Sequence, residues 1–231
     1  VEQQAVCSLH TGRQFLVVQR TALINHCRGL LTEFGIIMPL GADKVRRLFA
    51  EILADENTSV PLFLKDLLQL HLQDLARLEQ RIEAIDKQLA EWAKTNQQAM
   101  TLLQMLGVGV ITATAFAAGV CDAQLFENGR QFAAWLGLVP RQYSSGGKNK
   151  LGSITKAGDV YLRTMLAQGA RSIVFNAKKK SDPFSLWIQR LLERAGLNKT
   201  VIAVAAKQAR LMWAIMAKNQ DYQPERICSP V

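Results

Sequence analysis

The sequence predicts a mainly α-helical protein, in which a long helical hairpin or coiled coil precedes a compact helical domain. Apolar residues recur at intervals of three and four over most of the chain, as they do along one face of a helix. No alternating apolar and polar pattern of any length is present. Hydrophobic residues make up 49% of the 231 residues and charged residues 20%, which excludes wholesale disorder and allows an adequate core.

We expect a helical, coiled-coil linker region at residues 1–98 and a second domain at residues 99–231. In the first, residues 6–31 have helical spacing and a helix should end near Gly35, while residues 43–53 predict a short helix. From residue 64 to 92 the apolar positions follow steps of four and three, which is a heptad seam interrupted by the polar His71. The seam can pair with the first helix as an antiparallel hairpin or with another copy of the chain, and the pattern leaves both open.

The second domain begins with two short helices around residues 106–109, followed by a helical stretch at 126–138. A Gly- and Lys-rich loop is expected at 140–158, before three helices at 160–176, 183–194 and 200–218. Residues 99–121 carry no charge and are long enough to raise a transmembrane helix. Gly107 and Gly109 in the middle of that stretch favour a buried helical pair instead.

Positive charge is concentrated in the second domain. Residues 1–100 contain 11 Lys and Arg against 12 Asp and Glu, whereas residues 101–231 contain 17 against 7. Between residues 130 and 180 ten basic residues face one acidic residue, Asp159. Such one-signed clustering predicts a polyanionic partner, with DNA the first candidate, and a merely solvated basic surface is the alternative.

Four widely spaced cysteines without a CxxC pattern predict neither a disulfide scaffold nor a zinc ribbon, so a reducing cytoplasm is expected. Cys7, His10, His26 and Cys27 would form a metal site only if two helices faced each other, and such residues more often pack in cores. The sequence has no secretory leader pattern and does not begin with Met, which predicts a part of a longer protein or a processed product.

Leu106-Gly-Val-Gly109 lies between two helix-forming stretches, as in a helix-hairpin-helix module. In such a turn Gly107 and Gly109 let backbone N–H groups approach a phosphate, which gives DNA contact without sequence preference. The commoner form of the module has Pro at the position of Leu106. A tight turn packed inside the domain explains the same residues equally well.

The loop at 140–158 combines hydroxyl side chains and glycines with four basic residues that can stabilise charge on phosphorus oxygens: Arg141, Lys148, Lys150 and Lys156. That setting suits nucleophilic attack on a phosphodiester, and a flexible linker is the alternative. Ser153-Ile-Thr-Lys156 also matches the Ser-x-x-Lys of penicillin-binding enzymes, but the other motifs of that class are absent.

Four ordered motifs closely resemble the C-terminal transposase domain of the "one-ten" family of insertion-sequence transposases. These enzymes are also called DEDD transposases or bridge-RNA-guided recombinases. The resemblance covers essentially the whole chain. It rests on Leu103-Gln-Met-Leu-Gly-Val-Gly109, Gln131-Phe-Ala-Ala-Trp-Leu-Gly-Leu-Val-Pro140, Tyr143-Ser-Ser-Gly146 and Thr155-Lys-Ala-Gly-Asp-Val-Tyr-Leu-Arg163.

The resemblance implies a composite active site. The serine aligned with the family's nucleophile is Ser145, with Ser144 as its neighbour, and a resolvase-like domain N-terminal to Val1 would hold Mg²⁺ through four acidic residues. A structured guide RNA, DNA and further copies of the chain are the implied partners. Asp43, Asp55 and Glu56 are better explained as caps and solvated charges than as substitute ligands. We therefore expect this chain to bind DNA, to hold no metal and to cut poorly alone.

Two other functions remain open from the sequence. The chain can be a helix-hairpin-helix scaffold that binds DNA without catalysing a reaction, in which case no serine matters specially. It can also be a small membrane protein built on residues 99–121, although the basic charge and the motifs favour a protein that acts on DNA and does not bind a membrane.

Overall fold

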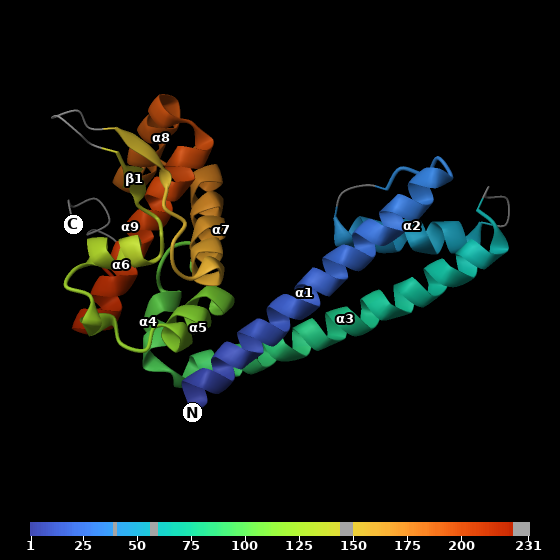
Figure 1. Cartoon of the computed structure of the whole chain (residues 1–231), viewed down its shortest axis with the longest axis horizontal. Coiled ribbons are helices and arrows are strands. Elements are labelled where there is room, and N and C mark those ends of the chain that lie inside the picture. The colour runs from blue at the N-terminus through green and yellow to red at the C-terminus, as the bar shows by residue number, and fades with distance from the viewer. Residues whose placement is uncertain (39–40, 56–59, 144–149, 224–231) are drawn as a thin grey trace. The chain divides into compact units, whose positions relative to one another are not determined.

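The computed structural model describes residues 1–38, 41–55, 60–143 and 150–223 (Figure 1). Helices dominate these residues, which confirms the mainly α class, and one small two-stranded sheet accompanies them. The elements are α1 (Glu2–Glu33), α2 (Ala42–Ala54), α3 (Leu62–Thr95), α4 (Gln97–Leu103), α5 (Val110–Gly119), η1 (Ala123–Leu125), α6 (Gly129–Trp135), β1 (Pro140–Gln142), β2 (Leu151–Ile154), α7 (Val160–Ala177), α8 (Pro183–Ala195) and α9 (Leu197–Lys218).

The chain divides into two compact units. One comprises residues 8–88, and the other comprises residues 1–7 with 89–231. We expected a boundary at residue 98, whereas in this division the last turns of α3 group with the C-terminal unit. The first turns of α1 group with it too, since the Gln3 side chain donates to the Ala117 carbonyl at 3.3 Å and the Trp92 indole donates to the Glu2 carboxylate at 2.7 Å.

In the unit of residues 8–88, α1 and α3 pair antiparallel within one chain. Arg13 forms a salt bridge with Asp86, and at the other end of the pair the rings of His26 and His71 meet edge to face, 5.3 Å between centroids. An Arg46–Glu79 salt bridge ties α2 to α3. The apolar core is built by residues from the three helices and their connections: Cys27, Leu31, Met38, Val45, Phe49, Ile52, Val60, Leu64, Leu68 and Leu75.

In the C-terminal unit, α9 is the central helix and contacts α4, α6, α7 and α8. Among the described residues it is the one helix long and apolar enough to cross a membrane, but 56% of its apolar window is buried inside the protein, as expected of a core helix. Residues from all these helices form one core, including Leu102, Phe116, Phe132, Leu136, Leu166, Val204 and Met212.

Residues 99–121 contain the end of α4 and all of α5, and not one long helix. Seven of the ten residues of α5 are buried, from Thr112 to Ala118. Ten residues are too few to span a bilayer, which needs about 20. The prediction of a helical pair in place of one membrane-spanning helix is confirmed, with α5 buried, whereas α4 buries two residues, Ala99 and Leu102.

Side-chain caps explain why the later helices begin where the sequence predicts. The Asp159 carboxylate accepts from the Leu162 N–H, and the Asp182 carboxylate accepts from the Ser185 N–H, each at 3.0 Å. Asp182 also precedes Pro183, which suits the first helical position because proline has no N–H to leave unpaired there. The predicted helix starts at 160 and 183 are confirmed.

The expectation of a loop without strands at 140–158 is wrong, because β1 and β2 form an antiparallel β-hairpin there, with Pro140 opposite Ile154 and Gln142 opposite Leu151. The strands have three and four residues and are exposed along almost their whole length. Such short strands have no buried face and therefore show no alternation of apolar and polar residues. The strands could not be predicted from that alternation.

Candidate nucleic-acid interface

The β-hairpin presents two of the predicted basic residues, Arg141 and Lys150, to solvent. Arg141 lies in β1 and Lys150 directly precedes β2, and the Tyr143 N–H donates to the Lys150 carbonyl at 2.8 Å. Residues 144–149 connect these two positions. Ser144, Ser145, Gly146, Gly147 and Lys148 belong to that connection and lie outside the described residues.

Two glycines with left-handed backbone conformations fix the base of the β-hairpin. Gly137 and Gly158 both have φ of 71°. A Cβ on Gly158 would collide with the Trp135 carbonyl oxygen, and a Cβ on Gly137 would lie 2.5 Å from the Ala157 nitrogen. Only glycine permits this approach without strain, so the end of α6 and the segment before α7 pack against each other directly.

Hydrogen bonds join the same two segments. The Lys156 N–H donates to the Gly137 carbonyl at 3.2 Å, and the Arg163 guanidinium donates to the carbonyls of Ala157 at 2.6 Å and Leu136 at 3.2 Å. Arg163 belongs to a motif that carries the family resemblance, but sequence reasoning gave it no role. The structure shows that two of the four motifs, at 131–140 and 155–163, meet to hold the β-hairpin in place.

The exposed cations of the β-hairpin have no acidic partner among the described residues. Within the described parts of the chain, Arg141, Lys150 and Lys156 form no salt bridge, and all three are exposed. The backbone of Lys156 has a φ of 57°. This is a left-handed conformation that residues other than Gly, Asn and Asp rarely adopt. Arg141 donates to the Thr155 carbonyl at 3.4 Å, which leaves its charge without an acidic partner. Exposed cations without a salt bridge suit contacts to phosphate oxygens.

The two predicted glycines of the α4–α5 turn have different surroundings from each other. Gly107 has φ of 74°, and a Cβ there would lie 2.8 Å from Ile173 Cδ1 and 2.9 Å from the Gly169 carbonyl oxygen. Packing against α7 therefore requires this glycine. Gly109 precedes α5 and has nothing within 4 Å of its Cβ position. A DNA contact at either residue stays a prediction.

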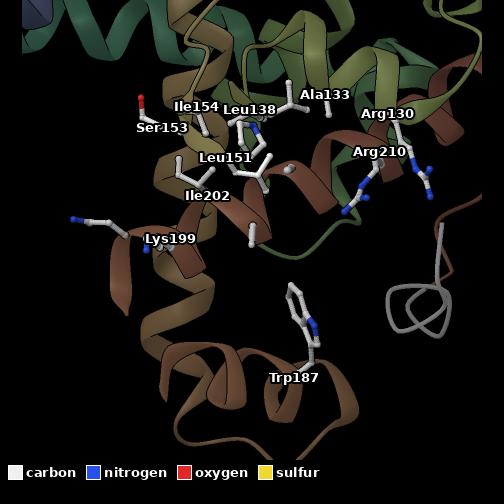
Figure 2. Close-up of a pocket in the computed structure, with 16 residues that line it drawn as sticks. Arg130, Ala133, Leu138, Leu151, Ser153, Ile154, Trp187, Lys199, Ile202 and Arg210 are labelled. Atoms are coloured by element: carbon white, nitrogen blue, oxygen red, sulfur yellow. The ribbon is translucent and has the colours of Figure 1, made fainter. Parts of the chain in front are cut away.

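A groove of about 760 Å³ lies beside the β-hairpin, between β2, α6, α8 and α9 (Figure 2). Its lining is mostly apolar, but Arg130 of α6 and Arg210 of α9 stand together at one end. Burial lowers the pKa of Arg210, and the nearby positive charge of Arg130 lowers it further. Sequence reasoning missed both arginines, although Arg210 follows Ala203 and Ala206 at helical spacing on an otherwise apolar face.

The described residues do not supply a metal site. No group of three or more His, Cys, Asp and Glu side chains suited to an ion occurs among them. Cys27 packs in the core of its unit, where burial raises the pKa of its thiol to about 11. Asp55 follows the last residue of α2 and its backbone carbonyl accepts from Lys65 Nζ, whereas Glu56 lies outside the described residues.

Comparison with known proteins identifies the family. Residues 99–185 match the model of the "Transposase IS116/IS110/IS902 family", and this range contains the α4–α5 turn, the β-hairpin and α7. A "Probable family 20 transposase" of Pseudomonas aeruginosa is 44% identical over 224 residues, covering 96% of this chain and 66% of that protein. The "Transposase for insertion sequence element IS1111A" of Coxiella burnetii is 40% identical over 223 residues, covering 96% and 61%.

A more distant relative, the "Pilin gene-inverting protein" of Moraxella bovis, is 25% identical over 129 residues, covering 55% of this chain and 39% of that protein. The chain thus spans about two thirds or less of the length of these relatives. The coverage of this chain is nearly complete in the two transposases, and the matched residues include the motifs around the β-hairpin. The chain belongs to the IS116/IS110/IS902 family of transposases.

Proposed function

We propose that this chain is the DNA-binding part of an insertion-sequence transposase and that it cleaves and rejoins DNA strands through Ser145. The observation that carries the proposal is the exposed β-hairpin. In it Arg141 and Lys150, two exposed cations without a salt bridge among the described residues, lie on either side of the connection that contains this serine. Two relatives are named as transposases and a third as a gene-inverting protein, which supports an activity on DNA.

The chemistry is a transesterification. The Ser145 hydroxyl oxygen attacks the phosphorus of a DNA phosphodiester, a phosphoseryl ester forms, and the bond from phosphorus to one sugar oxygen breaks. The serine loses one proton and the released sugar hydroxyl gains one. A hydroxyl of another strand then attacks the ester and regenerates the serine, so the bond energy is kept for rejoining. Arg141, Lys150 and Lys156 offset the negative charge that develops on the phosphate.

Mg²⁺ held by acidic residues N-terminal to this chain would add charge stabilisation at the phosphate. The described residues of this chain do not fit that ion, and no step above depends on it. We infer that the chain alone binds DNA but cuts poorly.

A guide RNA and further copies of the chain are proposed as partners. The excess of ten positive charges in residues 101–231 suits nucleic acid of either kind. Phe63, Leu67 and Leu70 are exposed on α3 at intervals of four and three residues, which suits helix pairing with a second copy.

A suicide DNA substrate, which traps the covalent adduct because the released strand diffuses away, tests the proposal on the full-length protein. Ser145→Ala should abolish the adduct. Ser172→Ala, an exposed serine on α7, is the matched control and should leave the adduct at the wild-type level. If the adduct persisted in Ser145→Ala, the proposed nucleophile would be wrong.

A DNA-binding scaffold without chemistry is the second candidate, because the open position of Gly109 at the start of α5 suits a backbone contact to phosphate. It predicts that the full-length protein binds the suicide substrate but forms no adduct with or without Ser145. The same experiment therefore separates the two candidates.

A further inference from the structure

The groove beside the β-hairpin has a shape and lining that the transesterification does not use. Its apolar wall comes from β2 and from one face of α9, with Leu151, Ile154, Ile202, Ala203 and Ala206 among the lining residues. Leu151 is 65% exposed although it is a large apolar residue. A volume of about 760 Å³ lies in the range of pockets that accept small organic groups, so the groove can hold a ring system the size of a nucleobase.

An aromatic side chain stands on the opposite side of the groove. Trp187 projects from α8 into the groove, across from the residues of β2 (Figure 2). Its ring stacks on Phe184 with centroids 5.6 Å apart and planes inclined by 10°, and Lys207 Nζ lies 5.4 Å from the ring centroid. The indole is half-buried and lines the groove, so the part of the ring that faces the groove is available for contact with a base.

The arginine end of the groove is suited to an anion. Gly129 allows α6 to approach α9 so closely that a Cβ there would be 3.0 Å from the Arg210 Cα, and this approach brings Arg130 beside Arg210. The Arg210 Nε is buried and has no hydrogen-bond partner among the described residues. The repulsion between the two guanidinium groups falls when a phosphate binds both, and guanidinium groups bind phosphate oxygens in pairs.

We propose that this groove holds one unpaired base of a nucleic-acid strand, with the base between Trp187 and the apolar wall and a flanking phosphate on Arg130 and Arg210. The inference rests on the proposed function, since it needs a chain that binds nucleic acid. Nucleic acid is favoured over a peptide as the occupant by the charge of the surrounding sequence, ten basic residues against one acidic residue between 130 and 180. A base that has left its duplex exposes both an apolar face and a charged backbone, which matches the two parts of the groove.

Binding of two labelled probes to the 231-residue chain tests the proposal. One probe is a single-stranded oligothymidylate, and the other has the same backbone with abasic sites in place of the bases. The wild-type chain should bind the probe with bases about 5- to 150-fold more tightly, as expected for one base on an aromatic ring. Trp187→Ala should remove this difference, and Trp187→Phe should keep most of it.

The arginines should act on the backbone of both probes. Arg130→Gln and Arg210→Gln should each weaken both probes to the same extent and lower the salt slope of binding by about 0.7, the value for one phosphate of a single strand. Arg171→Gln, an exposed arginine of α7 outside the groove, is the matched control and should change neither. Circular dichroism of each variant verifies that it is folded.

Three results would overturn the inference. If Trp187→Ala and Trp187→Phe both discriminated between the probes like the wild type, the base would lie elsewhere. If the arginine variants bound both probes normally while neutral variants of the β-hairpin lost duplex binding, the groove would not be used but the proposed function would stand. If the chain bound neither probe nor a duplex, the proposed function would fall together with the inference.

Discussion

Lys156 holds a backbone conformation that its residue type disfavours, at the base of the β-hairpin, with φ of 57°. A left-handed conformation costs a side-chain-bearing residue about 1–2 kcal/mol, asparagine tolerates it best, and a β-branched residue tolerates it worst. Because Lys156 already bears this cost, Lys156→Val should lower the free energy of unfolding by a further ~1 kcal/mol, while Lys156→Asn should leave it unchanged or raise it by up to about 1 kcal/mol. Urea unfolding measures both.

The two substitutions remove the same charge, so they separate conformation from charge. Both should weaken DNA binding to the same extent, because each removes one proposed phosphate contact. Equal stabilities of the Val and Asn variants would show that the left-handed conformation at this residue is not required for folding.

His10 on α1 predicts a pH dependence of stability. It is 4% exposed, and burial, followed by the charge of Arg13, lowers its pKa from 6.5 to about 4. Between these values the unfolded chain binds a proton that the folded chain does not, so stability falls as the pH is lowered from 6.5 to about 4. Urea unfolding at both ends of this window should show a smaller loss for His10→Gln than for the wild type.

The pKa of His71 is also lowered, mainly by burial. His71 therefore also lowers the stability at acidic pH, and it does so equally in the wild type and in His10→Gln. The comparison therefore isolates His10. An equal loss of stability in the wild type and in His10→Gln would contradict the assignment of a depressed pKa to His10.

Among the elements, the β-hairpin depends on a glycine that nothing else can replace. A Cβ on Gly158 would collide with the Trp135 carbonyl oxygen, and φ at this residue is 71°. Gly158→Ala should lower the free energy of unfolding by about 2 kcal/mol or more, because it adds both strain and a collision. Thermal and urea unfolding measure this effect.

Gly12 supplies a control with the same chemical change. It lies in the middle of α1 with nothing within 4 Å of its Cβ position. Gly12→Ala should raise the free energy of unfolding by about 0.5–1 kcal/mol, since alanine favours a helix interior. The two variants should therefore change the free energy of unfolding in opposite directions. If Gly158→Ala stabilised the protein, the packing described at the base of the β-hairpin would be excluded.

The helices were predictable from sequence because their signals are local. Asp159 and Asp182 mark helix starts by their own side-chain hydrogen bonds, and the apolar spacing of residues 160–176 reports the buried face of α7. The β-hairpin gave no such signal because its strands are short and exposed. Its position had nevertheless been singled out, since the motifs that carry the family resemblance lie on both sides of it.

At the scale of the whole molecule, the groove was not predictable because its parts are distant in sequence. Arg130 and Arg210 lie in α6 and α9, and only the close packing of Gly129 on α9 brings them together. Trp187 comes from a third helix. No single stretch of sequence shows that these three side chains lie close together. Arg141, Lys150 and Lys156, in contrast, are close in sequence, so they could be predicted as candidate DNA-binding residues from the local composition.

The distribution of charge predicts which residues govern DNA affinity. The triple variant Arg141→Gln, Lys150→Gln, Lys156→Asn should lower the salt slope of duplex binding by about 2 to 3, near 0.9 for each phosphate contact. A matched triple variant on α3 removes Arg77, Lys87 and Lys94, which form salt bridges with acids on the same helix. That variant should leave the slope unchanged, and equal effects of the two would exclude a specific role for the β-hairpin.

The attachment of DNA to Ser145 is tested most directly by locating the covalent bond. The full-length protein is trapped on a suicide substrate and digested with trypsin, which cuts after Arg141 and Lys148 and releases residues 142–148. Fragmentation of this peptide by mass spectrometry then assigns the nucleotide to one side chain. The nucleotide is expected on Ser145, and its appearance on Ser144 or on any peptide outside residues 142–148 would contradict the proposed mechanism.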